Sequence, residues 1–232
     1  YNQFIEPEQY EKSNHSNSLT ELNRIGASPS FLMLLFLYSL PNKAFVDKDN
    51  DLSELLDFLI KYYVRRNITD FPNTRNLDAI NIEVIEKCYQ YFKSGKKINS
   101  EFVINSLLTG KGKAADIKTF KENLEDNLYY YNAGMARYVL TKLDELSHSR
   151  EYRPDLWARN PKGLLVWTIE HIFPQGNNIP DAWVEMVANG DKKEAKKIQE
   201  KWSHCLGNLT LSGYNSKLSN ASFDDKQNLH EN

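Results

Sequence analysis

Apolar residues recur at helical spacing through the first two thirds of the chain. A stripe running from Leu52 to Tyr63 predicts one helix, which Asp51 or Ser53 could begin. Similar stripes predict further helices at residues 80–95, 102–108, 118–127 and 133–146. The apolar run from Phe31 to Leu40 is much shorter than the about 20 residues that a bilayer span needs, so we predict a buried core helix there.

After Ser149 the pattern changes to short apolar runs separated by polar connections. The predicted elements are two short strands, two helices between them and a following helix, at residues 164–169, 180–187, 192–202, 208–211 and 215–218. Trp183 and Trp202 are expected to anchor the two intervening helices in a core. Residues 150–162, which hold three arginines and two prolines, indicate a connection.

The N-terminal end is polar and predicts little regular structure. Residues 1–18 are interpreted as a linker or a disordered segment. The chain opens on Tyr1 and not on Met, so we expect a piece of a longer protein.

Charge and cysteine content narrow the class of protein only slightly. The formal net charge of -2 and the pI near 6.3 give no global nucleic-acid character, so a basic surface would have to come from clustering, for example of lysines between residues 192 and 201. Cys88 and Cys205 lie far apart and form no CxxC pair. A reducing, cytoplasmic setting without a membrane segment is therefore expected.

Candidate chemistry gathers in the last third of the chain. Glu170 and His171 stand together at the start of the run Glu-His-Ile-Phe-Pro, and two asparagines follow, Asn208 on the second predicted strand and Asn215 just beyond it. A neutral imidazole is a good base near pH 7, and carboxylate and amide oxygens are ligands that Mg²⁺ accepts. Adjacent residues of a strand point to opposite sides, so Glu170 and His171 can serve one site only if the chain bends there.

These residues resemble the HNH, or His-Me finger, nucleases. More closely, they look like the nuclease domain of GmrSD-type modification-dependent restriction endonucleases. The resemblance is carried by four blocks, Glu170–Pro174, Leu206–Leu211, Asn215–Asn220 and Ser222–Lys226, and extends more loosely upstream through the helices. It implies a mainly α protein, with a helical domain over residues 1–149 and a small ββα-metal nuclease domain over 150–232.

The resemblance also assigns roles to single residues. It implies that His171 is the general base, that Glu170 and Asn215 hold one Mg²⁺ or Mn²⁺ ion, and that Asn208 ties the loop and orients the base. Glu170 stands where the broader HNH class often has Asp, which keeps the charge but moves the carboxylate by about one bond. Lys217 could contact a phosphate.

Three further residues are candidates for contacts to phosphate or DNA. His204 is expected at the edge of the site, and Lys226 closes the last resembling block. For Asn220 a turn or cap role stays open, since Asn suits turns.

The function implied is that of a metal-dependent DNA endonuclease within a restriction or phage-defence protein. The expected partners are DNA, modified or not, and an N-terminal nucleotide-hydrolysing or sensor domain of the same protein. A homodimer stays open. Two alternatives for the whole chain also stay open: an inactive binding or regulatory module with a nuclease-like fold, and a nuclease that acts on RNA.

Three local features allow a second interpretation. The sequence Gly-Lys-Gly-Lys at 110–113 departs from the phosphate-loop pattern and follows a predicted helix instead of a strand. The run Tyr129-Tyr130-Tyr131 could stack nucleobases or simply pack. His171, His204 and Cys205 could together bind zinc, although no fourth ligand is evident.

Overall fold

The structure, a computed structural model, describes residues 2–7, 15–148, 153–213, 218 and 220–228. It divides into two compact units, Tyr1–Phe120 and Lys121–Asn232. The division falls inside α7 (Ile117–Glu125), ahead of the change in composition from which we predict a boundary between residues 149 and 150. That domain boundary stays a prediction, and each unit is described by itself.

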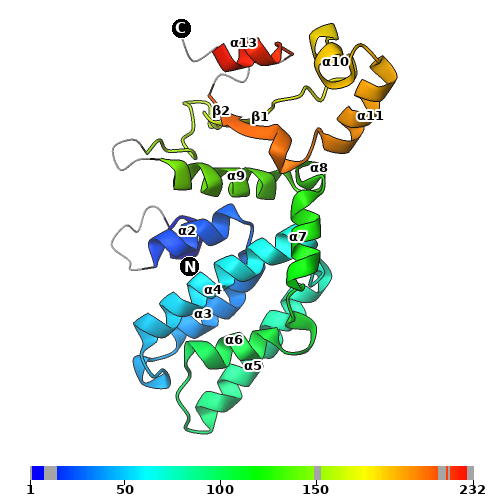
Figure 1. The fold of residues 1–232 in the computed structure, drawn as a ribbon. Coiled ribbons are helices and arrows are strands. Elements are labelled where there is room, and N and C mark those ends of the chain that lie inside the picture. The colour runs from blue at the N-terminus through cyan, green and yellow to red at the C-terminus, as the bar shows by residue number, and fades with distance from the viewer. Residues whose placement is uncertain (1, 8–14, 149–152, 214–217, 219, 229–232) are drawn as a thin grey trace. The chain divides into compact units, whose positions relative to one another are not determined.

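The first unit is built from helices (Figure 1). Their bounds are α1 (Asn2–Ile5), α2 (Ser16–Arg24), α3 (Phe31–Ser39), α4 (Lys48–Thr69), α5 (Leu77–Lys93) and α6 (Ser100–Leu108). Helix α4 packs against α2 and α6, and α5 packs against α3 and α6. Part of the expected N-terminal linker is structured, because α1 packs on α2 and the side chain of Phe4 is buried.

Helix α3 is a core helix, as its apolar run predicts. Met33, Leu34 and Leu37 are fully buried. In the described part of the chain no helix combines the length and the apolar character that crossing a membrane requires.

Helix α4 begins earlier than its apolar stripe indicates. Its N-cap is Asp47, whose side chain accepts a hydrogen bond from the backbone of Asn50, so the expected start at Asp51 or Ser53 is wrong. The carboxylate of Asp51 is buried and accepts hydrogen bonds from the backbone N–H groups of Asp47 and Ser100. Asp51 therefore joins the first turn of α4 to the first turn of α6.

The Gly-Lys-Gly-Lys sequence is a packed turn after α6. Gly110–Gly112 forms a short 3₁₀ helix, and the hydroxyl of Tyr62 donates a hydrogen bond to the carbonyl of Gly112. A Cβ atom on Gly112 would lie 1.8 Å from the carbonyl oxygen of Leu107. Close backbone approach therefore explains this glycine without a phosphate ligand.

The second unit combines a two-stranded sheet with helices (Figure 1). Its elements are α8 (Leu128–Tyr131), α9 (Ala133–Ser147), β1 (Thr168–His171), α10 (Asp181–Ala188), α11 (Lys192–Trp202), β2 (Leu209–Ser212) and α13 (Phe223–Asn228). Strands β1 and β2 are antiparallel, with Glu170 opposite Thr210 and His171 opposite Leu209. The predicted first strand is misplaced, since β1 begins only at Thr168.

A buried arginine fastens the connection before β1 to α9. Arg137 of α9 donates hydrogen bonds to the carbonyl oxygens of Trp167, at 2.7 Å, and Leu156, at 2.6 Å. Its guanidinium also lies 5.0 Å from the ring centre of Trp157. The connection at residues 153–167 is thus held against α9 by these hydrogen bonds and this ring contact. It does not extend β1 toward its N-terminal side.

The two helices between the strands are confirmed, but only one of their tryptophans is a core anchor. Trp183 of α10 is buried and its indole N–H donates to the carbonyl of Ala221. Trp202, in the last turn of α11, is 49% exposed, so its predicted place in the core is wrong. Asp191 caps α11 by accepting hydrogen bonds from the backbone of Lys193 and Glu194.

The fold class is confirmed at the level of a mainly helical protein with a small sheet. The helix expected at residues 215–218, which would complete a ββα unit, lies almost entirely outside the described residues.

Candidate functional site

Strand β1 turns Glu170 and His171 toward different neighbours. Glu170 meets Lys226 of α13, whereas His171 meets His204 and Tyr129 of α8. Figure 1 shows α9 and α13 flanking the β1–β2 pair. Because residues 168–171 form a regular strand, the bend that would bring both side chains to one side is not present within β1.

Glu170 belongs to a buried ion pair. Its Oε1 lies 2.7 Å from Nζ of Lys226, and each side chain is only 8% exposed. The same ammonium donates hydrogen bonds to the carbonyl oxygens of His171, at 2.8 Å, and Ile172, at 3.1 Å. Lys226, predicted to contact phosphate or DNA, is therefore enclosed by three oxygen atoms of its own chain.

His171 lies in an aromatic environment. Its Nε2 is 3.3 Å from Nδ1 of His204, and its ring packs edge-on against Tyr129 with centroids 4.8 Å apart. Tyr129 also stacks on His204, whose carbonyl accepts a hydrogen bond from the Tyr129 backbone. Burial, with smaller effects of His204 and Lys226, lowers the pKa of His171 to about 4, so the imidazole is neutral at pH 7.

Asn208 holds the chain that follows His171. It lies in a 3₁₀ turn (Leu206–Asn208) directly before β2, and not on the strand where we predict it. Its Oδ1 accepts from the N–H of Phe173 at 2.7 Å, and its Nδ2 donates to the carbonyls of Phe173, at 2.9 Å, and Ser203, at 3.0 Å. Its own carbonyl accepts from the N–H of Ile172. One amide therefore connects the segments that carry His171 and His204.

The other candidate residues contribute less to the described geometry. Asn215 and Lys217 lie outside the described residues, and Asn220 is exposed. The thiol of Cys205 contacts the side chain of Asn127 and the carbonyl of Lys201. Within the described ranges no three His, Cys, Asp or Glu side chains are placed to hold a metal ion, which includes the zinc trio with His171 and His204.

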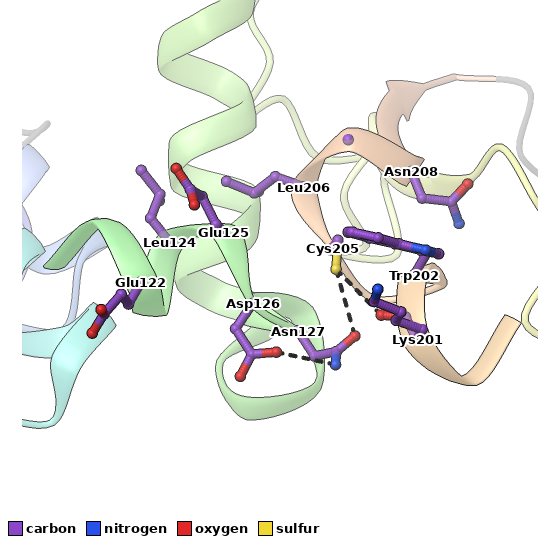
Figure 2. A pocket seen from close by; sticks show the side chains of 11 residues that line it. Glu122, Leu124, Glu125, Asp126, Asn127, Lys201, Trp202, Cys205, Leu206 and Asn208 are labelled. Atoms are coloured by element: carbon purple, nitrogen blue, oxygen red, sulfur yellow. Dashed lines mark hydrogen bonds between the residues drawn. The ribbon is translucent and has the colours of Figure 1, made fainter. Parts of the chain in front are cut away.

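Two pockets border these residues. One, of about 590 Å³, is lined in part by Glu170, Ile172, Thr210 and Lys226. The other, of about 1030 Å³, lies beside Trp202 and Asn208 (Figure 2). Its lining carries three carboxylates, Glu122, Glu125 and Asp126, against one lysine. The second pocket is therefore poorly suited to a phosphate group.

Two features of the site could not be found from sequence spacing. Tyr129 precedes His171 by more than forty residues, and its contact with the imidazole depends on how α8 packs. Lys226 is a lysine of the kind that usually lies at the surface, and only the fold shows its pairing with Glu170. In the sequence, the run of three tyrosines is the signal that points to Tyr129. Tyr129 packs against His171, whereas Tyr130 and Tyr131 are exposed.

Comparison with known proteins identifies the second half of the chain. A family model described as the C-terminal domain of GmrSD restriction endonucleases matches residues 114–232, about half of the sequence. Searches of curated proteins and of solved structures found no match. The matched range contains β1, β2 and every candidate site residue. The chain thus belongs to the GmrSD restriction endonuclease family, of which it carries the C-terminal domain.

Proposed function

We propose that this chain cleaves DNA phosphodiester bonds with the help of a divalent metal ion, and that His171 is its general base. The observation that supports this best is the placement of His171 at the end of β1, in contact with His204 and Tyr129, within the range that matches the restriction-endonuclease family. A base must be unprotonated before it can accept a proton, and burial keeps His171 in that form at neutral pH.

The contact with His204 occupies Nε2 of His171, so Nδ1 is the nitrogen that we propose as the base. Two neutral imidazoles share a hydrogen bond when one supplies an N–H group and the other a lone pair. If Nε2 of His171 donates to Nδ1 of His204, the lone pair of His171 Nδ1 is left to take a proton from water. Tyr129 and Asn208 would keep the ring and the adjoining chain in place.

Glu170 is the described residue that would hold the metal ion, and Asn215 is the second proposed ligand. A carboxylate oxygen is a ligand that Mg²⁺ prefers, and Mg²⁺ is usually bound by one or two protein carboxylates, with water and phosphate filling its other positions. The ion would supply positive charge to the phosphate during cleavage. Lys226 already neutralises Glu170 in the described geometry, so the lysine and the ion would share or compete for this carboxylate.

Cleavage of supercoiled plasmid DNA, modified and unmodified, in Mg²⁺ or Mn²⁺ tests the proposal. His171→Ala should lower the rate by about 10²- to 10⁴-fold while the circular dichroism spectrum is retained. His148→Ala, at the end of α9, is the matched control and should cleave like the unchanged protein. Equal cleavage by His171→Ala would remove His171 as the base, and no cleavage by the unchanged protein would reject the nuclease proposal.

An inactive module is a second candidate because Glu170 is paired with Lys226 and faces away from His171. Calorimetric titration with Mg²⁺ separates the two proposals. An active nuclease should bind the ion in a manner that Glu170→Ala abolishes, whereas an inactive module should show no such difference. Parallel assays on DNA and RNA of equal sequence would show which nucleic acid is cut.

A further inference from the structure

Helix α11 carries a row of lysines along its exposed side. Five of its eleven residues are lysines and two are glutamates. Lys193, Lys197 and Lys201 are spaced four residues apart and all are exposed, so they form a stripe about 12 Å long along one side of the helix. We call these three residues the lysine stripe.

The opposite side of α11 is fixed to the chain that follows His171. Ala195 and Gln199 are buried, and Nε2 of Gln199 donates hydrogen bonds to the carbonyls of Pro174, at 2.6 Å, and Gly176, at 2.9 Å. Because this side is held by the loop after β1, the lysine stripe has a fixed outward orientation.

Three lysines against two exposed glutamates of the same face, Glu194 and Glu200, leave the outer side of α11 with one net positive charge. Among the described residues neither Lys193 nor Lys201 has a carboxylate partner, and Lys197 pairs with Glu194 only at an exposed position. An exposed pair of this kind is weak, so a phosphate could replace the glutamate. Nζ of Lys201 lies 4.5 Å from the ring centre of the half-exposed Trp202, which holds the ammonium at the surface.

The stripe ends close to the candidate base. Lys201 stands three residues before His204, and the ring of His204 contacts His171. Lys201 and Trp202 line one side of the pocket in Figure 2, and Glu125 and Asp126 line another part of it. These carboxylates would repel a phosphate backbone, so they would keep it on the side of α11.

We propose that the lysine stripe binds the phosphate backbone of duplex DNA and leads it toward His171. This inference depends on the proposed DNA-cleaving function and adds the surface that holds the substrate. Phosphate contacts of this kind give affinity and orientation without sequence selectivity.

The test compares two triple variants that remove equal charge. Lys193, Lys197 and Lys201 are replaced by Gln in one, and the exposed Lys43, Lys97 and Lys113 of the first unit in the other. Binding of a fluorescently labelled duplex is followed by anisotropy at several salt concentrations without divalent ions. The stripe variant should bind at least about 10-fold more weakly at low salt. The negative slope of log K against log salt should become shallower by about 2 to 3.

Controls separate this inference from the proposal on which it depends. Replacing the stripe by Arg should restore binding, because the charge is kept, and the melting temperature should be unchanged in every variant. If the stripe variant binds like the control variant, the inference is wrong and the nuclease proposal stands. If the unchanged protein binds no DNA, both are rejected. Anionic lipid vesicles offer phosphate groups of another kind. If the stripe variant lost binding to such vesicles but still bound DNA, the inference would also be overturned.

Discussion

Lys226 and Glu170 lie 56 positions apart in the sequence and form an ion pair of 2.7 Å in which both side chains are buried. The lysine also donates hydrogen bonds to the carbonyls of His171 and Ile172, at and just after the C-terminal end of β1. Helix α13 is thereby fastened to the strand that carries both candidate catalytic residues.

Removing the lysine alone should be costly to the fold. Lys226→Met leaves the Glu170 carboxylate buried without a cation, and we expect the free energy of unfolding to fall by about 3 to 5 kcal/mol. Urea denaturation measures this change. The double variant Glu170→Gln with Lys226→Met should recover part of the loss, since it buries no charge. A single variant as stable as the unchanged protein would mean that the pair is open in solution.

The same substitution should change the response to metal. Without Lys226, the charge of Glu170 is available to a divalent ion, so Mg²⁺ should raise the melting temperature of Lys226→Met more than that of the unchanged protein. Differential scanning calorimetry with and without Mg²⁺ measures both shifts, and Glu170→Gln should show none. An equal shift in all three proteins would exclude Glu170 as a metal ligand.

Replacing Asn208 should destabilise the fold more than replacing Asn220. Asn208→Ala removes three hydrogen bonds that hold Phe173 and Ser203, and leaves the polar groups of the backbone without partners. The expected loss is about 1 to 3 kcal/mol of unfolding free energy. Asn220→Ala, at an exposed position, is the control and should stay within about 0.5 kcal/mol. Equal losses would show that the amide of Asn208 does not hold this loop.

The free energy of unfolding should decline as the pH falls below 6.5, before most carboxylates begin to titrate. The pKa of His171 is lowered from 6.5 to about 4, so the unfolded chain binds the proton more readily than the folded one. The stabilisation is complete above pH 6.5 and declines as the pH falls toward 4. Unfolding free energies measured at pH 7 and pH 5 give the slope, which His171→Gln should reduce. His204, whose pKa is also lowered by burial, keeps a smaller slope in that variant. An unchanged slope would mean that His171 titrates normally.

Gly112 should tolerate no side chain. Gly112→Ala places a Cβ atom 1.8 Å from the carbonyl oxygen of Leu107, so the turn must shift, at a cost of about 1 to 3 kcal/mol. The melting temperature reports this loss. The neighbouring Lys111→Ala is exposed and should change neither stability nor cleavage. An effect of Lys111→Ala on nucleotide binding would revive the phosphate-loop interpretation.

Local patterns in the sequence predict local structure well in this chain. The helix expected at residues 80–95 is present as α5 and is followed by Gly95 in a left-handed conformation, and α11 matches its predicted range. Trp183 and Trp202 show the limit. Both are large apolar residues of helices, yet which of them is buried depends on the packing around each helix end.

Long-range relationships in the candidate site were beyond the sequence pattern. The residue types of Glu170 and His171 indicate that both belong to the candidate site. Their different neighbours, and the pairing of Glu170 with Lys226, depend on strand geometry and tertiary packing. Lys226 is a candidate because it closes the last resembling block, and its predicted contact with phosphate or DNA stays a prediction beside the pairing with Glu170 that only the fold shows.

The two helices between the paired strands also affect the order of folding. β1 and β2 cannot pair until the chain from His171 to Leu209 has closed on itself, so this hairpin has a high contact order for its size. Formation of α10 and α11 shortens the distance to be closed. We expect the sheet to assemble late, so that Glu170 and His171 reach their final surroundings only after β1 and β2 have paired.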